Sequence, residues 1–238
     1  MLFRSSYANP IRFHFTDLPV IWARNQICAI GSKNKEEILY LFALLNSPII
    51  SSILNFNLKS EHEKNLLIST TAIKEFVRVP KINEDNQFIK DEIIKKTEEM
   101  LVLEEKKLSD FVDFSNIMVQ KYDSVSVKDC HLVLKRSDEV TKLDIRENFN
   151  LIKKVTYEKY NKKGLISDKQ SISLSELKDL PLIDCDKQRE LKDYIDDLVF
   201  ALYFNINIKN LGLNKETEIK SKLLANKYYN LVKTHTNN

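Results

Sequence analysis

The sequence contains little glycine, proline and cysteine. Its three glycines and five prolines in 238 residues are too few for a collagen-like, low-complexity or disordered chain. The hydrophobic content of 43% is enough for one sizeable core or two small ones. Cys28, Cys130 and Cys185 lie far apart and never in a Cys-x-x-Cys spacing, so neither a disulfide framework nor a zinc site is expected. We therefore expect a folded, helix-rich protein with small buried thiols in a reducing, cytoplasmic compartment.

The motifs of common catalytic sites are also missing. None of the four histidines has a second ligand at helical spacing, and there is no glycine-rich phosphate loop. Cys130 and His131 are neighbours on a predicted strand, so their side chains are expected on opposite faces and not in a dyad. Asp196 and Asp197 are adjacent on a predicted helix and are interpreted as a solvated face. We predict no catalytic residue and no metal ligand; an enzyme with an unrecognised site would need a concave polar cluster.

Charge of either sign is not in large excess. Lysine and arginine number 37 against 34 aspartates and glutamates, which gives a formal net charge of +3. A small positive charge tolerates an anionic partner, but no dense block of basic residues accompanies it. Charge alone therefore does not establish nucleic-acid binding.

An uncharged run at residues 38–58 is the most informative segment present. Its length is close to the roughly 20 residues that cross a bilayer, but Asn46, Ser47 and Pro48 in its middle would expose backbone polar groups that lipid cannot satisfy. We predict two buried helical pieces and no membrane span. The first ends near Asn46, Ser47 caps the second, and Pro48 takes the first helical position, where its missing N–H costs nothing.

Short strands and helices surround this run in the first part of the chain. Alternation predicts strands at 11–15 and 26–30, and strand-like segments at 66–68 and 77–80. The order Asn34-Lys35-Glu36-Glu37 has the spacing of a capping box and predicts the start of a helix. These elements would form a small sheet with helices packed on it.

The second part of the chain opens with a long helix. Residues 85–114 contain no glycine or proline and carry an apolar face, which predicts one helix that links two lobes. Further predicted elements are strands at 125–127, 131–134 and 143–145, an ambiguous segment at 149–160, a turn at Gly164, a short helix capped by Ser173 and Glu176, and helices at 186–204 and 216–232.

The expected fold class is α+β, with a small mixed-sheet recognition lobe and packed helices, a long connecting helix, and a second α+β lobe that ends in helices. The corresponding domains are 1–84, 85–114 and 115–238.

Several of these segments together resemble a DNA-recognition region. Residues 41–48, Leu-Phe-Ala-Leu-Leu-Asn-Ser-Pro, followed by Thr-Thr-Ala-Ile-Lys-Glu-Phe at 70–76 and Val-Pro-Lys-Ile at 79–82, resemble the C-terminal specificity region of Taq-like and type IIG adenine DNA methyltransferases. The junction Asn-Gln-Phe-Ile at 86–89 also looks like that of type I restriction specificity subunits. The Leu-Val-rich helix at 193–203 is similar to one near the end of type IIG proteins. The resemblance covers residues 1–114 and 186–204, and the interval between them poorly.

The chain departs from that family in lacking a methyltransferase or nuclease core. Asn9-Pro10 is followed by isoleucine and not by the Pro-Tyr or Pro-Phe of an adenine-methyltransferase motif. The resemblance therefore implies a non-catalytic target-recognition module, either a fragment or a stand-alone subunit. Its partners would be double-stranded DNA and a separate methyltransferase or nuclease core, and S-adenosylmethionine would belong to that core and not to this chain.

Base reading and phosphate contacts are expected from basic side chains in the connections of the first lobe, since Arg and Lys favour guanine or phosphate. The candidates are Arg4, Arg12, Arg24, Lys33, Lys35, Lys59, Lys64 and Lys74. The alternative is a helical protein–protein interaction scaffold without DNA binding, which would use the apolar faces of the helices at 85–114 and 186–204.

Overall fold

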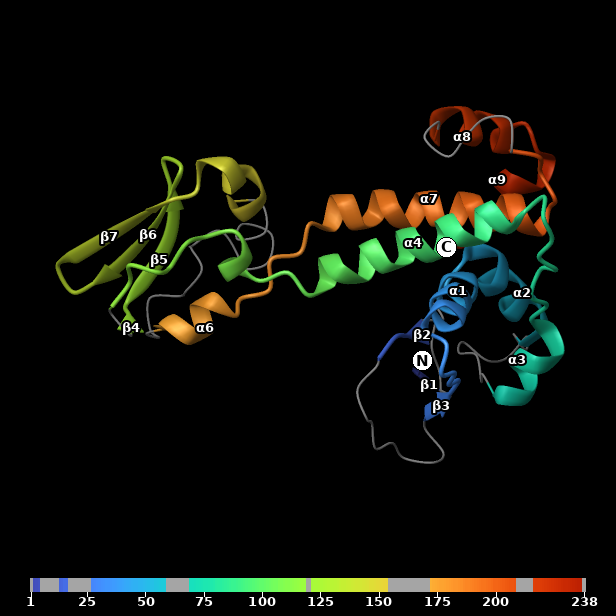
Figure 1. Ribbon diagram of the computed structural model, residues 1–238, viewed down its shortest axis with the longest axis horizontal. Coiled ribbons are helices and arrows are strands. Elements are labelled where there is room, and N and C mark those ends of the chain that lie inside the picture. Colours follow the sequence, from blue (N-terminus) through green and yellow to red (C-terminus); the bar gives the residue numbers. More distant parts are fainter. Residues whose placement is uncertain are drawn as a thin grey trace. The chain divides into compact units, whose positions relative to one another are not determined.

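The computed structural model describes residues 2–4, 13–16, 27–58, 69–118, 121–153, 172–208 and 216–236, with the backbone alone at 2–4, 27–29 and 233–236. The fold is α+β, as expected: helices accompany small antiparallel sheets (Figure 1). Packing divides the chain into two units, which are Met1–Glu99 with Glu190–Asn238, and Met100–Arg189. The second unit is thus an insertion in the sequence of the first. The domain boundaries expected from the sequence at 84/85 and 114/115 stay a prediction.

The first unit contains a three-stranded sheet. Its strands β1 (Leu2–Arg4), β2 (Phe13–His14) and β3 (Ile27–Ala29) lie in the order β2-β1-β3, and both described pairings are antiparallel. β2 and β3 fall inside the predicted strands at 11–15 and 26–30. β1 has no counterpart among the predictions.

Helix α1 (Lys35–Leu45) begins as predicted but with a different capping arrangement. The Asn34 Oδ1 accepts hydrogen bonds from the backbone N–H groups of Glu36 at 2.9 Å and Glu37 at 3.4 Å. The Glu37 carboxylate does not return to Asn34; it accepts from the Ser32 hydroxyl at 2.9 Å, and that hydroxyl oxygen accepts from the Asn34 N–H at 3.1 Å. Ser32 thus completes the cap that the predicted box assigned to Glu37.

The uncharged run folds as two packed helices with a break, as predicted. α2 (Pro48–Leu58) follows α1 after a bend of 61°. The Ser47 Oγ accepts from the Ile50 N–H at 3.4 Å and donates to the Leu44 carbonyl at 2.6 Å, and Ser47 is fully buried. Within the described part of the chain, a single helix with the length and apolar content for a bilayer crossing is not found; α1 and α2 pass that test only as this bent pair.

The segment after α2 differs from the prediction. Helix α3 (Thr70–Phe76), which was not predicted, is capped by Ser69, whose Oγ accepts from the Ala72 N–H at 3.1 Å. Residues 77–80 form no strand in the described structure, so the predicted strand there is wrong. The side chains of Ala72 and Ile73 on α3 are buried, and this burial stabilises the helix. Seven residues were too few for their hydrophobic pattern to predict it. The strand-like run at 66–68 lies outside the described residues.

Helix α4 (Gln87–Glu104) ends ten residues before the predicted end at 114. Within the second unit, the N–H of Leu108 donates to the Leu180 carbonyl at 2.8 Å, and the N–H of Leu182 donates to the Lys106 carbonyl at 2.8 Å. These bonds to a distant segment replace the helical i to i−4 bonds, and they place Leu108 in a core at 2% exposure. The single-helix prediction for 85–114 was wrong because its apolar residues belong to two different cores.

Helix α7 (Cys185–Tyr203) confirms the helix predicted at 186–204. Its apolar stripe is buried in the first unit, where Leu198, Val199 and Ala201 are fully buried and Ile195 is 1% exposed. The stripe therefore forms core and is not a free surface.

The final helix predicted at 216–232 is two helices, α8 (Glu216–Leu224) and α9 (Lys227–Thr236). Asn226 separates the two helices. Its backbone N–H donates to the Leu223 carbonyl at 2.8 Å, and its Oδ1 accepts from the Tyr228 N–H at 3.0 Å. The break lets Leu223 at 0% and Tyr229 at 2% exposure both face the interior.

The strand pairings described in the second unit are antiparallel. β5 (Ser124–Lys128), β6 (His131–Arg136) and β7 (Glu139–Asp144) form a meander, and β4 (Lys121–Tyr122) pairs with β8 (Ile172–Ser173). The strands predicted at 125–127 and 131–134 are confirmed. The third predicted strand at 143–145 starts four residues earlier, and Ile145 lies beyond it.

The remaining predicted elements of this unit are partly described. Residues 146–148 form the short helix η2 (Arg146–Asn148), and 149–153 are helical, so the first part of the ambiguous segment at 149–160 is a helix. Its remainder and the turn expected at Gly164 lie outside the described residues. Helix α6 (Leu174–Lys178) has the predicted capping box: Ser173 Oγ accepts from the Glu176 N–H at 3.2 Å and the Ser173 N–H donates to the Glu176 carboxylate at 2.9 Å.

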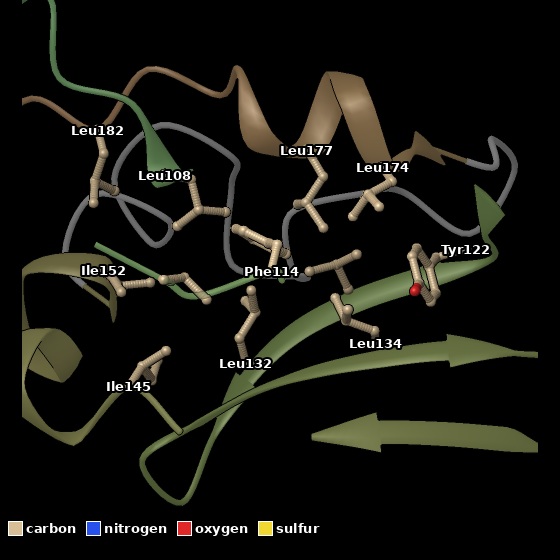
Figure 2. Packing of buried hydrophobic residues seen from close by; sticks show 12 residues of the cluster. Leu108, Phe114, Tyr122, Leu132, Leu134, Ile145, Ile152, Leu174, Leu177 and Leu182 are labelled. Carbon is tan, nitrogen blue, oxygen red and sulfur yellow. The ribbon is translucent and has the colours of Figure 1, made fainter. Parts of the chain in front are cut away.

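One face of the meander forms the core of the second unit. Figure 2 shows Leu132 and Leu134 of β6 pointing toward Leu174 and Leu177 of α6, with Phe114 between the two layers. Both β6 leucines and Leu177 are fully buried. The other face of the meander points away from this core.

Candidate nucleic-acid interface

Asn46 joins the first helix to the small sheet. Its Oδ1 accepts from the Phe13 N–H at 3.0 Å, and its Nδ2 donates to the Phe13 carbonyl at 3.2 Å and to the Phe42 carbonyl at 3.0 Å. The side-chain amide thus pairs with the β2 backbone in the way that a neighbouring strand would. The asparagine of the Leu-Leu-Asn-Ser-Pro element is therefore a connector between α1 and β2.

Apolar packing supports this connection. Phe13 is 3% exposed, and the Phe15 and Phe42 rings meet edge to face with centroids 6.2 Å apart. Leu44, Ile50 and Leu54 on the two helices are fully buried. Residues 41–48 consequently build the scaffold of this lobe, and contacts with a ligand fall to the exposed side chains around it.

The described predicted contact residues are Lys33, Lys35 and Lys74, and all three are exposed. Lys33 and Lys35 flank the N-cap of α1, and Lys74 lies on α3. The Lys35 ammonium pairs with the Glu98 carboxylate of α4 at 2.6 Å, with both side chains more than half exposed. An exposed pair of this kind is worth little, so Lys35 can exchange its partner at small cost.

The other predicted contacts fall in parts of the chain without described side chains. Only the backbone of Arg4 is described, in β1. Those outside the described residues are Arg12, Arg24, Lys59 and Lys64.

Arg78, Lys81 and Lys90 are cations of the first unit that were not among the candidates. Arg78 and Lys81 are exposed on either side of Pro80, and the Arg78 Nη1 donates to the Lys74 carbonyl at 3.2 Å. The Lys90 ammonium lies 5.4 Å from the centroid of the Tyr40 ring. The proline between Arg78 and Lys81 was the signal in the sequence that marked them as loop residues.

Carboxylates stand among these cations. Glu36 and Glu37 are exposed in the first turn of α1, where the helix dipole favours negative charge. An approaching phosphate would meet them beside Lys33 and Lys35. The N-terminal end of α1 is therefore a mixed-charge surface. Lys74, Arg78 and Lys81 follow one another along α3 and the segment after it, with the exposed Glu75 next to Lys74.

Asp196 and Asp197 are buried, at 8% and 5% exposure, so their interpretation as a solvated face was wrong. The Asp196 carboxylate pairs with Lys192 at 2.5 Å, and the Tyr229 hydroxyl donates to Asp197. Burial, with the hydrogen bond to Asp197, raises the pKa of Tyr229. Asp196 is thus paired with Lys192 within α7, and Asp197 with Tyr229 of α9. The two carboxylates do not share a proton as an acid–base pair would; their contacts stabilise the packing of these helices.

Cys130 occupies a turn and not a strand. It has a φ of 60° between β5 and β6, and its side chain is partly exposed. Cys185, at the start of α7, is exposed. The expectation of buried thiols is wrong at both positions, because turn and helix-start residues lie at the surface. The His131 Nδ1 lies 2.6 Å from the Asp129 carbonyl, so that nitrogen is directed to the backbone.

A cavity of about 300 Å³ in the first unit is lined at the start of α4 and after α7 by Asp85, Asn86, Asn205 and Asn207, among others. Its lining contains a single carboxylate and neither histidine nor cysteine, so an acid–base pair for general catalysis is not assembled there. Across the described ranges, no three or more His, Cys, Asp or Glu side chains are grouped to hold a metal ion.

Comparison with known proteins finds no match among family models, curated proteins or solved structures.

Proposed function

We propose that the chain is a non-catalytic DNA-recognition module of an adenine-specific restriction-modification protein. It would dock on double-stranded DNA and position a methyltransferase or nuclease core carried elsewhere. The observation that carries the proposal is the Asn46 joint: the most distinctive part of the resembling sequence links β2 and α1 through three side-chain hydrogen bonds. Because the asparagine of this motif has a defined structural role in the lobe, the resemblance is supported by more than a similarity of letters.

Contact with DNA would begin with phosphates. Lysine and arginine side chains neutralise phosphate charge and release counterions, which supplies most sequence-independent affinity. Lys74, Arg78 and Lys81 are exposed on adjoining parts of the first unit, and Lys33 lies before α1. Sequence discrimination would come from polar side chains of the connections entering a groove. Methyl transfer from S-adenosylmethionine would take place on the separate core.

The decisive measurement is a fluorescence-anisotropy titration of the whole chain with mixed-sequence duplexes at several salt concentrations. We expect binding that weakens as salt rises, with a slope of log K against log salt of about −0.9 for each neutralised phosphate. Absence of binding at low salt, or binding without salt dependence, would refute the proposal.

A matched pair of variants locates the contact. Lys33→Gln with Lys74→Gln removes two candidate contacts, and Lys95→Gln with Lys220→Gln removes two exposed charges elsewhere in the same unit. The first pair should reduce the magnitude of the salt slope by about 2 and the second should leave it unchanged. Equal effects would show that only net charge matters.

The alternative is a helical scaffold that binds protein partners. Its predicted surface included the apolar stripe of α7, which is buried within the first unit. Self-association that is insensitive to salt, with no retention of DNA, would favour that alternative over DNA recognition.

A further inference from the structure

The outer face of the β5–β7 meander carries a ladder of lysines. Side chains alternate across a strand, so the residues between the core leucines of β6 point away from the core drawn in Figure 2. The strand register pairs Lys128 with His131 and Asp144, Val133 with Ser126 and Lys142, and Lys135 with Ser124 and Val140. Each of these three successive outward rows therefore contains one lysine.

These lysines are available to a ligand. Lys128, Lys135 and Lys142 are all exposed, and the ion pairs found among the described residues involve none of them. Each lies on a different strand of a rigid antiparallel sheet, so the three ammonium groups share a surface that the backbone hydrogen bonds hold in place.

The negative charge on this face is already neutralised. Asp144, in the same row as Lys128, accepts hydrogen bonds from the guanidinium of Arg146, and this arrangement lowers the pKa of Asp144 to about 2. Asp129 and Asp138 lie in the two hairpin turns at the ends of the face. Glu139 of β7 is paired in register with Arg136, in a row that alternates with the outward ones. The three outward rows thus present three uncompensated positive charges.

The spacing of the lysines suits a phosphate backbone. Lys142 and Lys135 lie one row and one strand apart, and Lys128 and Lys142 lie one row and two strands apart. With about 6.8 Å between rows and about 4.8 Å between strands, their backbone positions are about 8 Å and about 12 Å apart. Long lysine side chains at these separations can reach different phosphates of one duplex, whose charges recur along both of its strands. The three rows contain no Phe, Tyr or Trp on which an unpaired base would stack, and their one ring, the His131 imidazole, lies at the end of the face with its Nδ1 directed to the Asp129 carbonyl. The chemistry of the face therefore fits the phosphates of a duplex better than a single strand.

We propose that the outer face of the β5–β7 meander is a second DNA-binding surface, which holds the sugar-phosphate backbone of double-stranded DNA through Lys128, Lys135 and Lys142. The inference rests on the proposed function of the chain as a DNA-recognition module and gives the inserted unit a role in it. Because lysine contacts with phosphate carry no base information, this face contributes affinity and register, and the choice of sequence remains with the first unit.

The test compares three triple variants of the whole chain by anisotropy titration with a mixed-sequence duplex. The first changes all three ladder lysines to glutamine, and the second changes them to arginine, which keeps the charge. The control removes the same charge from elsewhere in the second unit, with Lys121→Gln, Lys178→Gln and Lys187→Gln on β4, α6 and the first turn of α7. Thermal melting checks that each variant is folded.

The glutamine triple should weaken binding by about tenfold or more near 0.15 M salt and reduce the magnitude of the salt slope by about 2 to 3. The arginine triple and the control should keep the parent slope. If the glutamine triple behaves like the control while the parent chain binds DNA, the ladder proposal is overturned and the proposed function stands.

Failure of the parent chain to bind any duplex would overturn both proposals. The same ladder triple is therefore also titrated with anionic phosphatidylserine vesicles. Binding of the parent chain to vesicles and not to duplex, lost in the glutamine triple, would assign the face to a lipid surface and refute DNA as its ligand.

Discussion

At the scale of single residues, the hairpin between β5 and β6 holds two non-glycine residues in the left-handed region. Asp129 has a φ of 50° and Cys130 a φ of 60°. Positive φ at both central positions is the geometry of a type I′ turn, whose twist suits an antiparallel hairpin and whose second position favours glycine. The Ile145 N–H donates to the Cys130 carbonyl at 3.0 Å, which fixes the turn against the end of β7.

We predict that Cys130→Gly raises the free energy of unfolding of the protein by about 0.5–1 kcal/mol, because glycine accepts this φ without the steric cost of a Cβ. The measurement is urea denaturation followed by circular dichroism. Cys130→Ala removes the thiol and keeps the Cβ, so it should show no such gain. Equal changes for both variants would contradict backbone strain as the cause.

Burial of single residues was the property that the sequence predicted least well. The Asp196–Asp197 pair reads as a solvated face because charged residues on a helix are mostly exposed. The two carboxylates can be buried because Lys192 within α7 pairs with Asp196, and Tyr229 from α9 donates a hydrogen bond to Asp197. Asp197 and Tyr229 are 32 positions apart, so no local pattern announces their pairing.

At the scale of elements, Asn46 connects a helix to a strand that lies 33 positions earlier in the chain. A cap or a break needs only local partners, but this joint requires both elements to be in place. The connection should therefore matter more to stability than an asparagine whose bonds stay within one helix.

We predict that Asn46→Ala lowers the free energy of unfolding by about 1–3 kcal/mol, because the substitution removes three hydrogen bonds, two of them to the partly buried backbone of Phe13. Asn57→Ala is the matched control: among the described residues the Asn57 Nδ2 donates to the Ile53 carbonyl, within α2, and the effect of this substitution should stay within about 0.5 kcal/mol. Denaturation curves of the two variants measured side by side decide the prediction, and similar midpoints would count against the joint.

Elements were predictable where their signals were local. Ser47-Pro48 and Ser173-x-x-Glu176 specify helix starts through bonds that span three residues, and both starts were predicted. The ends of α4 and of α8 were not predicted. Leu108 lies beyond the end of α4, where its N–H donates to the Leu180 carbonyl, and Tyr229 lies in the separate helix α9, where it is buried.

At the scale of the whole molecule, buried tyrosines link stability to alkaline pH. Burial raises the pKa values of Tyr40, Tyr122, Tyr194, Tyr203 and Tyr229 above the ordinary value of 10. Above pH 10 the unfolded chain releases these protons, while the folded chain retains them. The unfolded state then binds fewer protons, so the free energy of unfolding falls as pH rises.

We predict that the urea midpoint is flat near pH 8–9 and declines from about pH 10 upward, together with the appearance of tyrosinate absorbance. Tyr40→Phe should make this decline shallower at little cost at neutral pH, since the Tyr40 hydroxyl has no hydrogen-bond partner among the described residues. Tyr228→Phe, at a ring that is 45% exposed, serves as control. An unchanged slope in Tyr40→Phe would contradict the prediction.

Sequence patterns were sufficient to predict the α+β class, the break of the uncharged run at Ser47-Pro48, the strands β5 and β6, and the long helix α7. Each of these depends on periodicity or on bonds between near neighbours, which are written in the local sequence. Part of the candidate interface was likewise accessible, because Lys33, Lys35 and Lys74 lie beside predicted connections and are exposed.

Other features became known from the three-dimensional packing: which apolar residues share a core, where α4 ends, and that Asp196 and Asp197 are buried. The same is true of the successive rows of one sheet face on which Lys128, Lys142 and Lys135 lie. All of these depend on pairing between segments far apart in the chain. Strand register and packing are set by the whole set of competing contacts, and this is the physical reason that a single sequence left them open.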